Sequence, residues 1–277
     1  MSVEIGDCSL CLSKGVPLHL SHFMPGSLYP LFRAGNLHPV RFSAEKLEQT
    51  SKQVKDYVFC GDCEKVFNAG GESWIHTLFG VFNGPFPLRE RLLKQAPIKE
   101  MGGTKLYAAA KNPEVDVPKL THFGCGVFFK AAVHPWHGNP SRPYILMEPD
   151  EIDALRQYLL GKADLPKTMA LGVTVDSAPV VWQQMIEPYP IAPVLGLKSY
   201  LFYMPGIAFQ LFIGEGAQEK IWTCINGSPD GPVMYENVSL TMRNTSRMAL
   251  KDAEWPQKLL DMVADLEKKG LNVRLGD

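Results

Sequence analysis

The spacing of apolar residues predicts helices and strands in the second half of the chain. Residues 150–160 place three apolar side chains on one helical face, with Asp150 as the cap and Gly161 as the stop. Pro205 and Gly206 suit a type II turn between two apolar runs. The runs that predict strands are Ala170–Val175, Val180–Ile186, Tyr200–Met204, Ile207–Ile213 and Lys220–Ile225. Together they indicate an antiparallel sheet.

Four other segments complete the expected fold. The apolar run Cys125–Val133 predicts another strand, and apolar residues within 74–82 recur at helical spacing. Ser43–Lys55 predicts a short exposed helix capped by its serine, and Asp252–Lys269 predicts a closing helix with an apolar stripe. Because helices and strands occur in separate runs, the predicted fold class is α+β.

Composition and charge exclude several classes of protein. The chain has 277 residues, 45% of them hydrophobic, with 28 Lys plus Arg against 29 Asp plus Glu. This is a globular composition rather than a disordered one, and its balanced charge excludes bulk electrostatic coating of nucleic acid or anionic membrane. Residues 191–214 are the most apolar stretch, but Pro193, Lys198 and Pro205 interrupt any membrane-spanning helix. Since residues 1–7 lack a signal-peptide pattern, we expect a cytoplasmic protein.

One stretch is locally basic. Arg89–Lys111 contains six Lys or Arg and two Glu. It is either a solvated face and linker or a strip that contacts the phosphates of DNA or RNA. We therefore expect three parts: a metal-binding module at 1–85, a basic linker or helix at 86–114, and an α+β domain at 115–277.

Four of the six cysteines form two CxxC pairs, which are Cys8 with Cys11 and Cys60 with Cys63. A CxxC turn directs two thiolates to one point, and two such turns can close a tetrahedron around Zn²⁺. A redox motif is the alternative, but it needs only one pair. The sequence predicts a structural zinc site with these four ligands.

Between the pairs lies a Ser-His-Phe-Met-Pro segment at residues 21–25. The order CxxC, His with Pro shortly after it, and a second CxxC running into a helix resembles nucleases of the HNH class, which have a ββα-metal or treble-clef-like core. The resemblance covers about the first 75 residues, in a chain that also looks like bacterial proteins with paired CxxC motifs. It implies that His22 is the general base for phosphodiester hydrolysis and that Glu64 is a ligand for catalytic Mg²⁺ or Mn²⁺.

Two positions depart from the HNH pattern. Ser21 replaces the acidic metal ligand before the His, and the family's middle Asn is missing, so the oxygen ligand would come from Asp56 or Glu72. His22 could also be a packed imidazole or an alternative zinc ligand. The alternative function is a non-catalytic, zinc-stabilised protein that binds nucleic acid, a protein or a small ligand.

A second group of histidines has spacings that could hold a metal. These residues are His122, Cys125, His134 and His137. Because Trp136 and neighbouring phenylalanines indicate a hydrophobic environment, we expect these side chains to be packed in the core rather than to bind metal.

Overall fold

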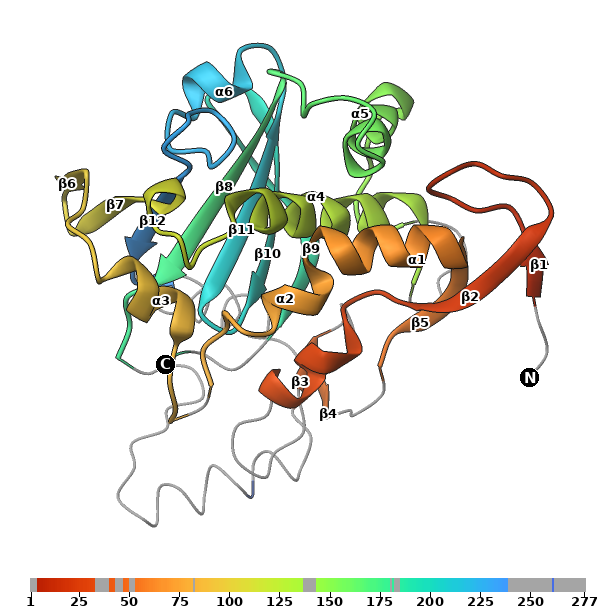
Figure 1. Cartoon of the computed structure of the whole chain (residues 1–277), viewed down its shortest axis with the longest axis horizontal. Helices are drawn as coiled ribbons and strands as arrows, with labels where there is room; N and C mark the ends of the chain where they lie inside the picture. The colour runs from red at the N-terminus through yellow and green to blue at the C-terminus, as the bar shows by residue number, and fades with distance from the viewer. Residues whose placement is uncertain are drawn as a thin grey trace.

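The computed structural model describes residues 4–32, 40–42, 47–49, 53–81, 83–136, 143–179, 181, 185–238 and 261. It has the α+β fold that the sequence predicts, with one large sheet, one three-stranded sheet near the N-terminus and one two-stranded sheet (Figure 1). The predicted closing helix at 252–269 lies outside the described residues apart from Asp261. Among the described residues, no helix is long and apolar enough to cross a membrane.

The large sheet has seven strands in the order β6-β7-β12-β8-β11-β10-β9. Each neighbouring pair is antiparallel except β12 with β8, which is parallel. The strands are β6 (Lys99–Met101), β7 (Thr104–Ala108), β8 (Met169–Asp176), β9 (Ile186–Val194), β10 (Leu197–Met204), β11 (Ile207–Ile213) and β12 (Pro232–Glu236). The predicted antiparallel sheet is thus confirmed, with one parallel pair added.

The predicted hairpin in this sheet is confirmed. Gly206 has a φ of 86°, the left-handed conformation that a type II turn requires, and it joins β10 directly to β11. Phe202 and Phe209 lie opposite each other on the two strands, with stacked rings whose centroids are 4.6 Å apart. Aromatic pairs across strands stabilise the register of a hairpin.

The predicted strand Cys125–Val133 is wrong, because this segment belongs to the long helix α4 (Val117–Val133). Asp116 caps it by accepting a hydrogen bond from the backbone N–H of Lys119. Helix α4 lies between the large sheet and the N-terminal segment, so it is buried nearly all round (Figure 1). A helix that is apolar on every side lacks the periodicity that distinguishes it from a buried strand.

Other element predictions need smaller corrections. The helix predicted at 150–160 is α5 (Pro149–Leu159), but Glu148 rather than Asp150 caps it, through a capping box with Glu151. Most of the predicted strand Val180–Ile186 lies outside the described residues, and Ile186 begins β9. The predicted strand Lys220–Ile225 is wrong, because the segment contains the end of α6 (Ala217–Lys220) followed by turns.

The helix predicted at 74–82 is wrong over most of its length, because helical structure begins at Gly61 and ends at Ile75, and residues 76–78 form a turn; Phe82 lies outside the described residues. Helical structure runs through α1 (Gly61–Phe67), the π-helical η2 (Asn68–Glu72) and α2 (Ser73–Ile75), with a kink at Gly71, whose φ is 152°. A Cβ at Gly71 would lie 2.6 Å from the carbonyl oxygen of Lys119 in α4, so the absence of a side chain permits this close approach.

The N-terminal segment consists of short elements around the cysteines. Strands β1 (Glu4–Gly6), β2 (Val16–His22) and β5 (Lys55–Cys60) form an antiparallel sheet in that order, and α1 follows β5 directly. The predicted helix at 43–55 is wrong where it is described, because β4 (Leu47–Gln49) pairs with β3 (Val40–Phe42) and β5 begins at Lys55. The remaining elements are η1 (Gly26–Phe32), α3 (Pro87–Leu92) and η3 (Ala109–Lys111).

One hydrophobic core connects the N-terminal segment with the large sheet. Phe59 of β5 contacts Phe67 of α1, and the same ring lies 6.4 Å from that of Phe129 in α4 and 6.3 Å from that of Trp136. Phe128, one residue before Phe129, faces Phe202 of β10 with ring centroids 5.0 Å apart. Aromatic side chains of α4 therefore contact both halves of the molecule.

Candidate metal centre

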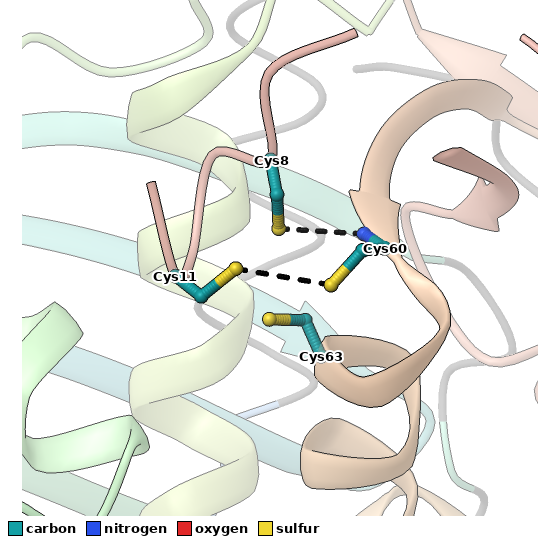
Figure 2. Close-up of side chains that lie close together, drawn as sticks. All are labelled: Cys8, Cys11, Cys60 and Cys63. Atoms are coloured by element: carbon teal, nitrogen blue, oxygen red, sulfur yellow. Dashed lines mark hydrogen bonds between the residues drawn. The ribbon is translucent and has the colours of Figure 1, made fainter. Parts of the chain in front are cut away.

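The four predicted ligands come from two separate turns (Figure 2). Cys8 and Cys11 lie in the turn between β1 and β2, which is closed by hydrogen bonds from the Leu12 N–H to the Cys8 carbonyl (2.9 Å) and from the Cys8 N–H to the Ser13 carbonyl (3.0 Å). Leu12 has a φ of 62°, so this turn carries a strained, left-handed residue. Cys60 ends β5 and Cys63 lies in the first turn of α1.

The sulfur positions fit a tetrahedral metal ion. All four Sγ atoms lie within 4.8 Å of one another, and those of Cys11 and Cys60 are 3.8 Å apart. A tetrahedron with Zn–S bonds of about 2.3 Å has sulfur–sulfur edges of about 3.8 Å. The cluster is therefore compatible with a structural metal such as zinc. It is also the only group of three or more metal-ligating side chains among the described residues.

Each CxxC pair contributes one buried and one partly exposed cysteine. The side chains of Cys8 and Cys63 are 1% and 3% exposed, whereas Cys11 and Cys60 are partly exposed. The Sγ of Cys8 also accepts a hydrogen bond of 3.3 Å from the Cys60 backbone N–H. Such backbone donors stabilise a thiolate without adding a formal charge.

The four thiols influence one another's ionisation. Hydrogen bonds from the Cys63 thiol and from nearby backbone N–H groups lower the pKa of Cys8 to about 4, although burial opposes this. The neighbouring Cys8 sulfur and burial both raise the pKa of Cys63, and burial raises that of Cys60. Burial and the neighbouring sulfurs therefore oppose a second thiolate in the cluster, and a bound cation would offset that repulsion.

The predicted catalytic residues each have a partner of their own. Nε2 of His22, at the end of β2, lies 2.8 Å from Oε1 of Gln53. Glu64, in α1, accepts a hydrogen bond of 2.5 Å from the hydroxyl of Ser21, which is 1% exposed. The residue before His22 is thus next to Glu64, while His22 bonds elsewhere.

The two carboxylates considered as substitute metal ligands have side-chain partners at the end of α4. Asp56 Oδ2 lies 2.8 Å from Nε2 of His134, and Glu72 Oε1 lies 2.5 Å from Nζ of Lys130. Burial would raise the pKa of Asp56, but the hydrogen bonds from His134 and from the Tyr57 N–H outweigh it and lower that pKa. Sequence reasoning missed both contacts because they join residues 58 and 78 positions apart, and no local pattern signals such a pairing.

The second histidine group is dispersed. His122 Nε2 bonds to the Leu159 carbonyl at 3.2 Å, and its ring packs against Gly70, where a Cβ would lie only 2.2 Å away. Burial lowers the pKa of His122 and raises the pKa of the fully buried Cys125. His137 lies outside the described residues.

The basic stretch Arg89–Lys111 spans α3, β6, β7 and η3. Three of its lysines form ion pairs, which join Lys94 to Glu114, Lys105 to Glu100 and Lys111 to Asp230. The two arginines donate to backbone carbonyls, Arg89 to Ala178 and Arg91 to Glu114. The ammonium of Lys99 lies 4.3 Å from the ring centroid of Trp222, whose side chain is 46% exposed.

Comparison with known proteins does not identify a family for this chain. No protein-family model matches the chain, and neither the curated proteins nor the solved structures give a significant match. The geometry defines an α+β protein with a four-cysteine cluster that could hold a metal.

Proposed function

We propose that this protein binds one zinc ion through Cys8, Cys11, Cys60 and Cys63, and that the ion has a structural role. The observation that carries the proposal is the four sulfurs around one point with a tetrahedral edge of 3.8 Å between Cys11 and Cys60. Four protein ligands leave no position open for water or substrate, which distinguishes structural zinc sites from catalytic ones. The ion would tie the turn between β1 and β2 to the start of α1.

Metal content tests this proposal directly. Protein purified without added metal should contain one zinc per chain by elemental mass spectrometry, and Cys63→Ser should lose most of it. Cys224→Ser is the matched control, because Cys224 is buried far along the chain from the cluster and should leave the zinc content unchanged. Wild-type protein without tightly bound metal under reducing conditions would refute the proposal.

We propose a binding function for the molecule around this centre, with DNA or RNA as the partner of Arg89–Lys111. Lys99 beside the half-exposed Trp222 supports this, since a cation next to an exposed ring suits a nucleic-acid strand. Because three lysines of the stretch are already ion-paired, few phosphates would be neutralised, and we expect weak binding with a shallow salt dependence.

Fluorescence anisotropy with labelled single-stranded and double-stranded oligonucleotides tests this surface. Lys99→Glu should weaken binding several-fold, and Lys162→Glu, an exposed lysine outside the basic stretch, should reproduce only the effect of the net charge change. Equal effects of the two variants would exclude a site at Lys99.

Phosphodiester hydrolysis by an HNH-like module is the second candidate. The order of elements favours it: the β1–β2 turn with the first cysteine pair, β2 ending at His22, then β5, the second pair and α1 with Glu64. In that role His22 would accept the proton of the attacking water, and Glu64 would hold Mg²⁺ or Mn²⁺. Both side chains would have to leave their present partners, Gln53 and Ser21, to act together.

A nicking assay separates the two candidates. Zinc-loaded protein with supercoiled plasmid and Mg²⁺ or Mn²⁺ should produce nicked circles if the module is catalytic, and His22→Ala should abolish nicking with zinc retained. His76→Ala, at an exposed position, is the matched control. If wild-type protein does not nick the plasmid, or if His22→Ala nicks it equally well, the hydrolytic function is excluded and only the binding function remains.

A further inference from the structure

The four cysteines of the cluster differ in solvent exposure, and the spacing of the two CxxC motifs does not predict this difference. In each CxxC pair one residue is buried, Cys8 or Cys63, and the other is partly exposed, Cys11 or Cys60. The sulfurs of the two partly exposed cysteines point toward each other across the cluster, 3.8 Å apart (Figure 2). The pair most accessible to a reagent in solution therefore joins the two motifs.

On the basis of the proposed zinc centre, we propose that Cys11 and Cys60 are its redox-sensitive pair. A hydroperoxide that reaches the cluster converts these two thiolates into a disulfide, and the centre then loses its metal. Cys8 and Cys63 stay reduced. The disulfide keeps the β1–β2 turn attached to the start of α1. Reduction of the disulfide therefore restores the four thiols close together, ready to bind zinc again.

The chemistry balances with hydrogen peroxide as the two-electron oxidant. One of the two exposed thiolates attacks a peroxide oxygen, the O–O bond breaks, and hydroxide leaves, which gives a sulfenic acid. The other thiolate attacks that sulfur, the S–O bond breaks, and a second hydroxide leaves as the S–S bond forms. Two protons from solvent convert the hydroxides into two waters.

The geometry favours this pairing over a disulfide within either motif. A bond of about 2.0 Å requires Cys11 and Cys60 to approach each other by less than 2 Å. Cys8 is shielded from solvent, and its sulfur is held by the Cys60 backbone N–H. Cys63 is equally buried, so an oxidant in solution reaches neither buried sulfur first.

The cross-link would also conserve part of the fold. Cys11 and Cys60 are 49 positions apart, and a disulfide between them restricts the unfolded chain over the whole intervening loop. We therefore expect the oxidised, metal-free protein to melt at a higher temperature than the reduced, metal-free protein, and both to melt below the zinc-loaded form.

The test uses the full-length, zinc-loaded protein titrated with hydrogen peroxide. A chromogenic chelator measures released zinc, and alkylation followed by peptide mapping without reductant identifies disulfides. We expect one equivalent of zinc released for each Cys11–Cys60 disulfide, with recovery on adding dithiothreitol and zinc. The buried Cys125 and Cys224 should stay reduced and serve as internal controls.

Several outcomes would overturn the proposal. These are a disulfide within either CxxC motif, a Cys8–Cys63 disulfide as the first product, or retained zinc at peroxide concentrations that oxidise free cysteine. Cys11→Ser should form no disulfide to Cys60, and the linkage in wild-type protein remains decisive if this variant loses metal. Protein that contains no zinc before peroxide is added contradicts the proposed zinc centre, whereas zinc-loaded protein that resists peroxide contradicts only the redox pair.

Discussion

At the scale of single residues, the buried side chain of Lys130 in α4 is held by several partners at once. Its ammonium is 1% exposed, donates to Glu72 (2.5 Å) and to the backbone carbonyl of His22 (3.1 Å), and lies 4.5 Å from the ring centroid of Phe67. The Nε1–H of Trp136 donates to the Lys130 carbonyl at 2.7 Å. A buried charge is tolerated only when such partners replace water.

Because Glu72 keeps more access to solvent than Lys130, the two halves of this ion pair should respond differently to substitution. The Glu72 side chain is 14% exposed, against 1% for Lys130. Glu72→Ala strands a buried ammonium and should cost about 3–5 kcal/mol of unfolding free energy. Lys130→Met should cost less, since the remaining carboxylate can be hydrated and the methionine fills the space. Urea denaturation measures the unfolding free energy of both variants. A larger loss of unfolding free energy for Lys130→Met than for Glu72→Ala would contradict this account.

At the scale of elements, two glycines of α4 make a matched pair. A Cβ at Gly124 would lie 2.9 Å from side-chain atoms of both Leu171 and Phe209 on the sheet, whereas a Cβ at Gly126 would meet Phe67 at an ordinary 3.4 Å. Gly124→Ala should therefore destabilise by about 1–3 kcal/mol through overpacking. Gly126→Ala should be neutral or stabilise by up to about 1 kcal/mol through helix propensity. Thermal unfolding measures the melting temperatures of the two variants. Gly124→Ala should melt below Gly126→Ala at each of two scan rates.

The elements that could be predicted from sequence are those with a local signal. The turn at Pro205–Gly206 identified the hairpin β10–β11, and apolar spacing with Gly161 identified α5. Helix α4 could not be recognised, because burial between the sheet and the N-terminal segment makes it apolar on every side. Its helical nature depends on tertiary contacts that no short window of sequence contains.

The candidate site shows the same division. The CxxC spacing predicted that the two cysteine pairs lie together. Each pair forms a local turn, and one zinc ion would need all four thiolates as ligands. Other contacts depend on tertiary packing. Ser21 reaches Glu64, and Asp56 and Glu72 reach their partners, only because β2, β5 and η2 pack against each other and against α4. The roles of His22 as general base and Glu64 as metal ligand stay predictions.

At the scale of the whole molecule, α4 packs against both the segment that carries the four-cysteine cluster and the large sheet. The Phe59 ring, on the residue before Cys60, contacts Phe67, Phe129 and Trp136, and the buried Lys130 bonds to the strand that follows the first cysteine pair. Loss of metal would free the ends of β2 and α1, and the surface of α4 beneath them would then become accessible to water.

Hydrogen–deuterium exchange can locate how far this effect extends. After zinc removal by a chelator under reducing conditions, β2, β5 and α1 should lose protection, and so should the last turn of α4 around Lys130. Strands β8, β10 and β11 should stay protected, because their hydrogen bonds and their Phe202–Phe209 contact do not involve the cluster. Adding zinc should restore the original pattern. Unchanged exchange in α4 would mean that the cluster stabilises only its own turns, and lost protection across the sheet would mean that the molecule unfolds as one unit.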